Sequence, residues 1–221
     1  MAIKVEILEI TNATHDVKEF KLEKPKGYEF TPGQATEVAI NLPDWMDAKR
    51  PFTFTSLPEQ EHLEFVIKSY PEKKGVTDRM NRLRPGDQLL IENPWGAIQY
   101  KGKGVFIAGG AGITPFISIF RMLEEQGKVQ GNSLFFANKT SKDVIKEAYF
   151  RGILGENFVS VLDQEEASGH EFGRIDLDFL KSHVSDFSQH FYVCGPDPMV
   201  KAISSHLKAL GAEPEEIVFE K

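Results

Sequence analysis

The spacing of hydrophobic and polar residues divides the chain into two parts. In the first hundred residues, short stretches alternate between apolar and polar side chains, at 3–7, 38–42 and 63–67. A period of two is typical of strands with one buried face. Turns rich in Gly and Pro lie between them, among them 84–87 (Arg-Pro-Gly-Asp) and 93–96 (Asn-Pro-Trp-Gly). Many short strands joined by such turns predict a small antiparallel barrel.

From residue 105 the pattern changes to strands that alternate with helices. Residues 105–108 are a continuous apolar run, as expected for a parallel strand buried on both faces. Apolar residues at helical spacing follow, at Phe116, Ile119, Phe120 and Leu123. The alternation continues with strands expected at 134–137, 158–162, 191–194 and 217–219, and with helices at about 142–154 and 199–207. This pattern predicts a doubly wound parallel sheet.

The polar stretch Lys-Gly-Lys-Gly at 101–104 separates the two patterns. We therefore predict two domains, residues 1–101 and 102–221. A chain of 221 residues is long enough for two modest domains that each bury a core. Its 41% hydrophobic and 27% charged residues are ordinary for a globular protein, which argues against disorder.

Charge and targeting features narrow the function classes. The net charge of −7 disfavours nonspecific binding to nucleic acid or to an anionic membrane. No apolar run reaches the roughly 18 residues of a membrane helix. The first ten residues alternate as a strand does and lack the apolar block of a signal peptide. We expect a cytoplasmic monomer.

The chain has one cysteine, Cys194. One cysteine cannot form a disulfide within the chain or the four-cysteine site of an iron–sulfur cluster. We therefore expect any one-electron carrier that works with this protein to be another molecule.

A glycine-rich turn lies between the first strand and the first helix of the second half. It reads Gly-x-Gly-x-x-Pro, with Gly110, Gly112 and Pro115 at the fixed positions. Glycines allow a close approach to a ligand, and the free N–H groups of a helix N-terminus bind phosphate. Proline suits the first helical position, but the dinucleotide fingerprint has glycine there, so we expect a different loop. A tight turn that binds nothing is the alternative.

A second motif, Cys-Gly-Pro-Asp-Pro-Met at 194–199, also lies between a predicted strand and a predicted helix. Open α/β sheets bind ligands at the carboxyl ends of their strands. Because cysteine is often a small buried apolar residue, packing alone would also explain Cys194.

Together these motifs resemble the ferredoxin–NADP reductase superfamily, and they occur in that family's order over nearly the whole chain. The motifs are 50–53 (Arg-Pro-Phe-Thr), 75–77 (Gly-Val-Thr), the pair 84–87 and 94–96, 110–115 and 194–199. The resemblance implies an antiparallel Greek-key flavin-binding barrel followed by a nicotinamide-binding α/β domain.

The resemblance also assigns residues. It gives flavin contacts to Arg50, Pro51, Phe52, Thr53, Ile67, Lys68, Gly75, Val76 and Thr77. It gives nicotinamide-dinucleotide contacts to Gly110, Gly112, Thr114, Pro115, Cys194, Gly195, Pro196, Asp197 and Met199. Asp163, where the chain departs from the family's NADP-binding motif, is a further candidate contact. Thr53, Cys194 and Glu220 are the residues expected at the reacting atoms. No metal ligand is expected.

The residue types agree with these roles. The guanidinium of Arg50 suits a phosphate. Phe52 has a flat face that can cover a flavin ring, and Thr53 has a hydroxyl that can bond flavin N5. A solvated arginine, a core phenylalanine and a threonine chosen for strand propensity are the plainer explanations.

The resemblance implies hydride transfer from a reduced nicotinamide dinucleotide to flavin N5, and then electron transfer to a separate acceptor such as ferredoxin or flavodoxin. We expect FAD, with FMN as the alternative. Asp163 favours NADH over NADPH because a carboxylate repels a 2′-phosphate, although Lys139 or Arg174 could reverse this. A free flavin or ferric reductase, a non-catalytic electron-transfer subunit and a binding module without redox function are the other readings.

Overall fold

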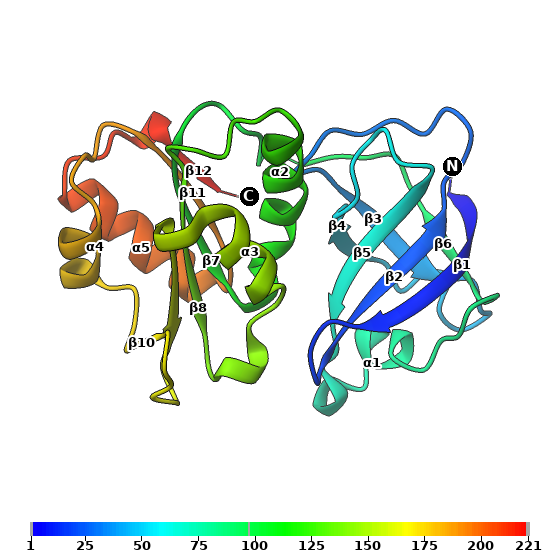
Figure 1. Cartoon of the computed structure of the whole chain (residues 1–221). Coiled ribbons are helices and arrows are strands. Elements are labelled where there is room, and N and C mark those ends of the chain that lie inside the picture. The colour runs from blue at the N-terminus through cyan, green and yellow to red at the C-terminus, as the bar shows by residue number, and fades with distance from the viewer. Residues whose placement is uncertain (1, 97, 220–221) are drawn as a thin grey trace.

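The computed structural model describes residues 2–96 and 98–219, which form two domains lying side by side (Figure 1). The strands of the first domain are β1 (Ile3–Asn12), β2 (Val17–Glu23), β3 (Ala35–Ile40), β4 (Arg50–Thr53), β5 (His62–Lys68) and β6 (Gln88–Ile91). They pair antiparallel in the order β4-β3-β6-β1-β2-β5. A bridge between Phe54 and Phe65 links the two edges, so the sheet nearly closes into a barrel.

The barrel differs from the sequence prediction at several strands: β2, β4 and β6 were not predicted, and β3 has other bounds than expected. The strand expected at 38–42 ends at Ile40, because the Leu42 N–H turns back to the Ile40 carbonyl at 2.7 Å. Strand β2 was not predicted, since its buried residues do not alternate toward one core. Phe20 and Leu22 pack inside the barrel, whereas Val17, on the opposite face, packs against the second domain.

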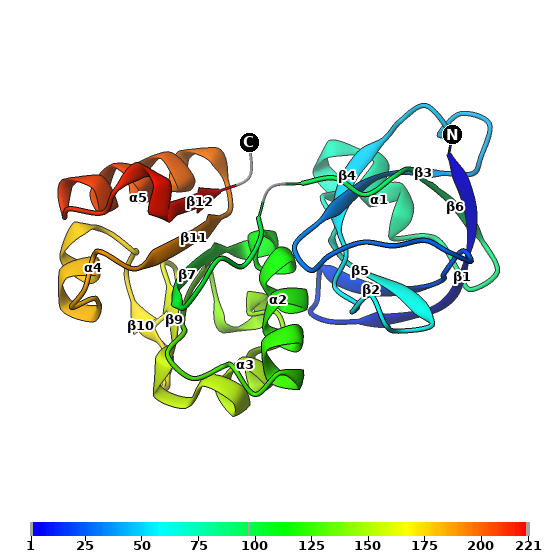
Figure 2. The same cartoon turned by 90° about the horizontal axis from the view of Figure 1, so that it is seen from above.

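The second domain contains a parallel sheet in the order β10-β9-β8-β7-β11-β12. Its strands are β7 (Gly104–Gly109), β8 (Ser133–Asn138), β9 (Phe158–Leu162), β10 (Glu171–Phe172), β11 (His190–Cys194) and β12 (Ile217–Phe219). Helices α2 (Thr114–Glu125) and α3 (Glu147–Leu154) cover one face, and α4 (Leu177–His183) and α5 (Asp197–Ala209) cover the other (Figure 2). The predicted fold class, a barrel followed by a doubly wound sheet, is confirmed.

Alternate side chains of the central strand, β7, pack on opposite faces of the sheet. Phe106 and Ala108 of β7 pack in the cluster under α2 and α3, and Val105 and Ile107 pack in the cluster under α4 and α5. Because β8 and β11 flank β7 and their crossovers run on opposite faces, the strand order reverses at β7. A crevice forms at the carboxyl ends of strands at such a point.

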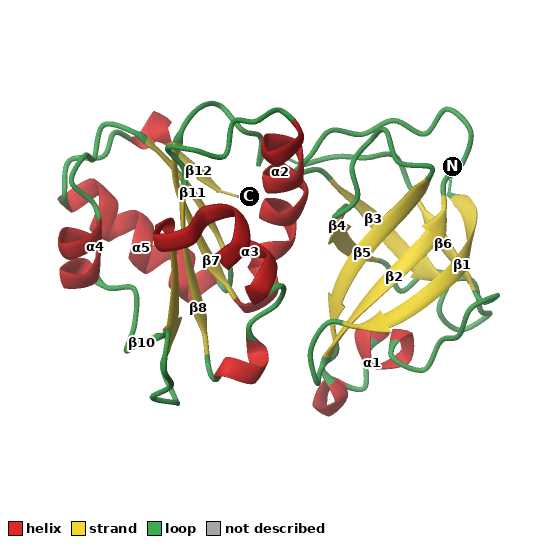
Figure 3. Ribbon diagram, viewed as in Figure 1, coloured by secondary structure: helices red, strands yellow, loops and turns green. Residues whose placement is uncertain are grey.

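Further short elements that were not predicted are α1 (Val76–Met80), α4 and β10 (Figure 3). The helix expected at 142–154 begins only at Glu147. Residues before it form a 3-10 turn, Ser141–Asp143, closed by the Asp143 carboxylate, which accepts from the Thr140 N–H at 2.9 Å and from its hydroxyl at 2.7 Å. Lys146, just before the helix, has a left-handed φ of 53°.

Half-buried ion pairs join the two domains. Arg121 of α2 donates to the Glu64 carboxylate of β5 at 2.8 Å, and Lys146 donates to the Glu19 carboxylate of β2 at 2.8 Å. Burial alone would raise the pKa of Glu64, but the Arg121 charge, hydrogen bonds from Thr55 and Arg121, and the Lys146 charge outweigh it and lower that pKa. Such pairs are screened by salt less than exposed ones. Among the described residues, no helix has the length and apolar character needed to cross a membrane.

Candidate active site

A cleft of about 1080 Å³ lies between the domains. One side, which we call the barrel wall, consists of cleft residues between Ala35 and Trp95. The other side, the α/β wall, consists of cleft residues between Gly109 and Ile203, at the carboxyl ends of β7, β8, β9 and β11. The strand-order reversal at β7 therefore opens directly onto the barrel.

Most of the residues assigned from the sequence line this cleft. They are Pro51, Phe52, Thr53, Ile67, Lys68, Thr77, Gly110, Gly112, Thr114, Asp163, Cys194, Gly195, Pro196 and Met199. Five of the assigned residues are not part of the lining: Arg50, Gly75, Val76, Pro115 and Asp197. Glu220 lies outside the described residues.

Strand β4 brings a ring and a hydroxyl to the barrel wall. Thr53 is 8% exposed and lies directly opposite Ala35 of β3. Phe52 is half-buried and packs 6.3 Å from the Phe65 ring, centroid to centroid. Arg50, at the start of the strand, is exposed and donates to the Lys49 carbonyl at 2.6 Å. The wall thus offers an apolar face beside one polar group, with a cation at its rim.

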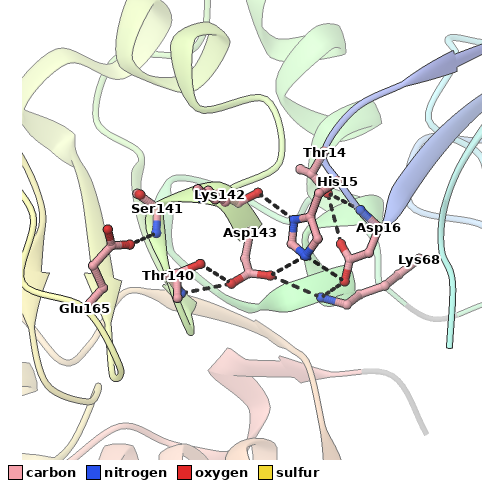
Figure 4. Close-up of polar contacts among 9 residues, drawn as sticks. All are labelled: Thr14, His15, Asp16, Lys68, Thr140, Ser141, Lys142, Asp143 and Glu165. Carbon is pink, nitrogen blue, oxygen red and sulfur yellow. Dashed lines mark hydrogen bonds and ion pairs between the residues drawn. The ribbon is translucent and has the colours of Figure 1, made fainter. Parts of the chain in front are cut away.

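The end of β5 places an ammonium group between two carboxylates (Figure 4). Lys68 Nζ lies 2.9 Å from Asp16 Oδ2 and 3.7 Å from Asp143 Oδ1, which comes from the other domain. Burial alone would lower the pKa of Lys68, but the hydrogen bond to Asp16 and the two carboxylate charges outweigh it and raise the pKa. Lys68 is therefore a fixed cation at the cleft.

His15 completes this charged cluster of His15, Asp16, Lys68 and Asp143. Its Nε2 lies 3.8 Å from Asp16 Oδ2 and 3.9 Å from Asp143 Oδ1. Burial raises the pKa of Asp143, but its bonds to Thr140 and the Lys68 and His15 charges lower it overall. The histidine and the two carboxylates lie close enough to hold a metal ion, but the Lys68 ammonium already supplies positive charge at both carboxylates.

The glycine turn packs tightly against the end of β11. A Cβ on Gly112 would lie 2.4 Å from the Cys194 carbonyl oxygen, and one on Gly109 would lie 2.3 Å from Met199 Sδ. Gly110 has a φ of 52°, which favours glycine. The turn is a 3-10 segment, Gly110–Ile113, so α2 begins at Thr114 and Pro115 is its second residue, not its first as predicted.

The motif after β11 lies across from this turn. Cys194 is 8% exposed at the last position of β11, and Gly195 and Pro196 follow it along the cleft. Asp197 is exposed and begins α5. The α/β wall at this point is therefore mostly backbone and small side chains, which allows a flat ligand to approach closely.

Three buried polar atoms of the α/β wall have no hydrogen-bond partner among the described residues. They are the amide nitrogen and oxygen of Asn138, at the end of β8, and Oδ1 of the partly exposed Asp163, just after β9. Asp163 Oδ2 lies 3.7 Å from Nε of the exposed Arg174. Buried polar groups normally have partners, so these atoms fit a ligand with hydroxyl groups.

Sequence reasoning missed several cleft residues, chiefly Trp95, Tyr70, Lys73, Asn138 and Asp143. Asn138 could have been found, because it follows the predicted strand 134–137 directly and polar residues at that position face the crevice. Asp143 could not, since it was expected inside a helix.

The cleft accommodates both a flavin and a dinucleotide. Its volume exceeds the upper range of ordinary small-molecule pockets, about 1000 Å³. The absence of a Cβ at Gly109 and Gly112 lets the turn pack against the end of β11 and Met199, which brings its backbone to the cleft. Asn138 and Asp163 offer unbonded polar atoms for ribose.

Known families match both halves of the chain. Residues 4–100 match the oxidoreductase FAD-binding domain family, and residues 106–205 match the oxidoreductase NAD-binding domain family. The fold and the cleft thus define a two-domain protein whose halves match the FAD-binding and NAD-binding families of oxidoreductases. The chain belongs to the ferredoxin–NADP reductase-like superfamily. The predicted cofactor, FAD, is confirmed by this match.

Curated relatives are similar over most of the chain. The reductase component of propane 2-monooxygenase from Rhodococcus jostii (strain RHA1) is 27% identical, over 99% of this chain and 63% of that protein. NADH–cytochrome b5 reductase 1 from Arabidopsis thaliana is 31% identical, over 76% of this chain and 65% of that protein. The chain therefore spans somewhat less than two thirds of the length of these relatives.

Solved structures share the fold. A ferredoxin NADP+ reductase from Neisseria gonorrhoeae with bound FAD and NADP has a TM-score of 0.84 and 21% identity, and the alignment covers 99% of this chain and 98% of that one. A cytochrome P450 reductase from Amycolatopsis has a TM-score of 0.87 and 24% identity, over 100% and 69%.

Proposed function

We propose that this protein is an NAD(P)H-dependent flavoprotein reductase that passes electrons to a separate acceptor protein, such as a ferredoxin or a flavodoxin. One observation carries the proposal: a single cleft has the FAD-binding motif on one wall and the dinucleotide-binding turn on the other. The bound cofactors supply the hydride chemistry, and the protein orients them.

The barrel wall holds the flavin in this proposal. The apolar face of Phe52 excludes water from the ring, and the nearly buried Thr53 hydroxyl hydrogen-bonds the atom that accepts the hydride. Thr77 bonds a phosphate oxygen. Arg50, which is exposed at the rim, neutralises the pyrophosphate.

The α/β wall orients the dinucleotide. The turn of Gly110 and Gly112 seats its phosphates at the N-terminus of α2, and Cys194 packs beside the nicotinamide as a polarisable group and not as a nucleophile. Glu220 stays a candidate for assisting proton transfer.

We propose NADH as the preferred reductant. Asp163 Oδ1 is buried without a partner and can accept a hydrogen bond from a ribose 2′-hydroxyl, whereas a 2′-phosphate there would meet a carboxylate. The cations nearby, Lys139 and Arg174, are exposed and can turn to solvent.

A protein acceptor is supported by the relatives, several of which are named reductase components of oxygenase systems. The division into residues 1–101 and 102–221, the monomeric state and the cytoplasmic location are proposed with it. The domain division is supported by the gap between the last barrel strand, which ends at Ile91, and β7, which begins at Gly104.

An anaerobic titration tests the proposal. We expect the purified protein with bound FAD to lose its yellow colour on addition of stoichiometric NADH, and to need more NADPH for the same bleaching. Ferredoxin or flavodoxin should then reoxidise it faster than free flavin or ferric citrate does. Faster turnover with the small acceptors would instead identify a free flavin or ferric reductase, and absence of bleaching would contradict the proposal.

A further inference from the structure

Trp95 is a large apolar residue with no assigned role, and its placement is unusual. Its side chain is 38% exposed, yet it lines the cleft. The second tryptophan, Trp45, packs against the barrel core instead. An exposed indole in a cofactor cleft needs an explanation beyond packing.

The backbone of Trp95 is fixed beside strand β3. Its N–H donates to the Ala35 carbonyl at 2.7 Å, and the Ala35 N–H donates to the Trp95 carbonyl, also at 2.7 Å. The two residues therefore form a directly opposed antiparallel pair. Gly96 follows with a φ of 127°, a conformation that only glycine adopts readily.

Ala35 also lies directly opposite Thr53, on the other side of β3. Directly opposed residues of antiparallel strands point to the same face. Thr53, Ala35 and Trp95 thus form a row on one face, and all three line the cleft. Thr53 and Trp95, at the two ends of the row, are therefore separated by two inter-strand spacings, about 9–10 Å.

The middle of this row carries little side chain. Ala35 has a single methyl group and is 1% exposed, whereas Thr53 is 8% exposed and Trp95 is 38% exposed. The row therefore has a hydroxyl at one end and an indole at the other, with no bulky side chain between them. Its shape and chemistry suit a flat, elongated aromatic system whose polar edge lies at Thr53.

We propose that Trp95 is a flavin-contact residue, whose indole bounds the isoalloxazine at the end of the row opposite Thr53. The inference rests on FAD binding in this cleft. Aromatic contact of this kind contributes to affinity, so loss of the ring in Trp95→Leu should weaken FAD binding by about three- to tenfold. Trp95→Phe keeps an aromatic ring and should bind FAD nearly as well as the parent.

The fluorescence lifetime of bound FAD tests contact directly. An excited flavin in contact with an indole or a phenol takes an electron from it, returns it and loses its emission, whereas a phenylalanine ring cannot donate. Because Tyr70 also lines the cleft, all variants carry Tyr70→Phe. In this background we expect Trp95→Phe to lengthen the lifetime several-fold, and the matched control Trp45→Phe to leave it unchanged.

Three other outcomes would overturn the inference. One is an equal FAD lifetime in the parent and in Trp95→Phe, which would show that the indole does not touch the flavin ring. Another is a lifetime that Trp45→Phe lengthens as much as Trp95→Phe does. The third is an FAD affinity of Trp95→Leu that equals the affinity of the parent. A parent that binds no FAD at all would contradict the proposed function itself.

Discussion

The two walls of the cleft present different parts of the polypeptide to a ligand. The barrel wall presents side chains, among them the Phe52 ring, the Thr53 hydroxyl and the Lys68 ammonium. The α/β wall presents backbone at its glycine turn, where a Cβ at Gly112 would overlap the end of β11. A side-chain wall can be tuned one substitution at a time, whereas a backbone wall tolerates almost none. Substitutions on the two walls should therefore differ in their effects.

The largest effect is expected at the backbone wall. Gly112→Ala would place a Cβ 2.4 Å from the Cys194 carbonyl oxygen, so the turn or the end of β11 must move. We expect the KM for NADH to rise about tenfold or more, with a stability loss of about 1–3 kcal/mol from overpacking. FAD affinity, which depends on the barrel, should not change.

Gly152→Ala is the matched control for Gly112→Ala. Apart from the backbone of α3 itself, no atom of the described residues lies within 4 Å of a Cβ at Gly152, which is inside this helix. This change should therefore be neutral or stabilising by about 0.5–1 kcal/mol. Steady-state kinetics and thermal unfolding compare the two. Similar kinetics for both variants would show that the turn is not a close-packed binding surface.

The next effect concerns the polar end of the α/β wall. Asp163→Asn removes a charge beside the proposed ribose site but keeps the size of the side chain. We expect the ratio of kcat/KM for NADPH to that for NADH to rise about tenfold, in line with loss of a charged hydrogen bond. Glu166→Gln, at an exposed loop position, should leave the ratio unchanged. An unchanged ratio in Asp163→Asn would place the ribose elsewhere.

On the barrel wall, Thr53→Ala removes one hydroxyl. If it bonds the hydride-accepting atom, the rate of flavin reduction should fall about tenfold, the value of one hydrogen bond of about 1.4 kcal/mol. Thr53→Ser should restore most of the rate. Stopped-flow measurement at saturating NADH gives the rate of flavin reduction. Equal rates in the Ala and Ser variants would show that the Thr53 hydroxyl does not take part and that the residue only packs.

The smallest effect concerns the charged cluster. The raised pKa of Lys68 means that its contribution to stability is complete below about pH 10.4 and is lost as pH rises through the folded pKa. The lowered pKa of Asp143 means that its contribution is present above about pH 3.9 and is lost as pH falls through the folded pKa.

Lys68→Met tests this linkage. Near pH 7 we expect the free energy of unfolding to fall by about 0.5–1 kcal/mol, the usual value of a partly exposed ion pair. The difference from wild type should shrink in acid and above the lysine pKa. Chemical unfolding at several pH values measures it, and a difference independent of pH would show that Lys68 contributes by packing alone.

Regular periodicity explains which parts of the fold could be read from the sequence. Strand β9 was predicted with its observed bounds, because its residues form a continuous apolar run between polar loops. Strand β10 has two residues, both exposed, and so carries no apolar pattern. The start of α3 was misplaced because Val144 and Ile145 are buried, as in a helix, but Val144 is extended and Ile145 lies in a turn.

The site followed the same rule. Residues in local motifs, such as Thr53 and Cys194, could be assigned from a short stretch of sequence. The contact between Asp143 and Lys68 could not, because it joins two domains across 75 positions of the chain. Trp95 lies inside a motif that was recognised as a turn, but only the pairing with Ala35 reveals that its ring faces the cleft.

The ion pairs that join Arg121 to Glu64 and Lys146 to Glu19 have a consequence for timing. They fasten α2 and the segment before α3 to the barrel, so the width of the cleft is set before either ligand arrives. Little hinge closure is then needed when a ligand enters.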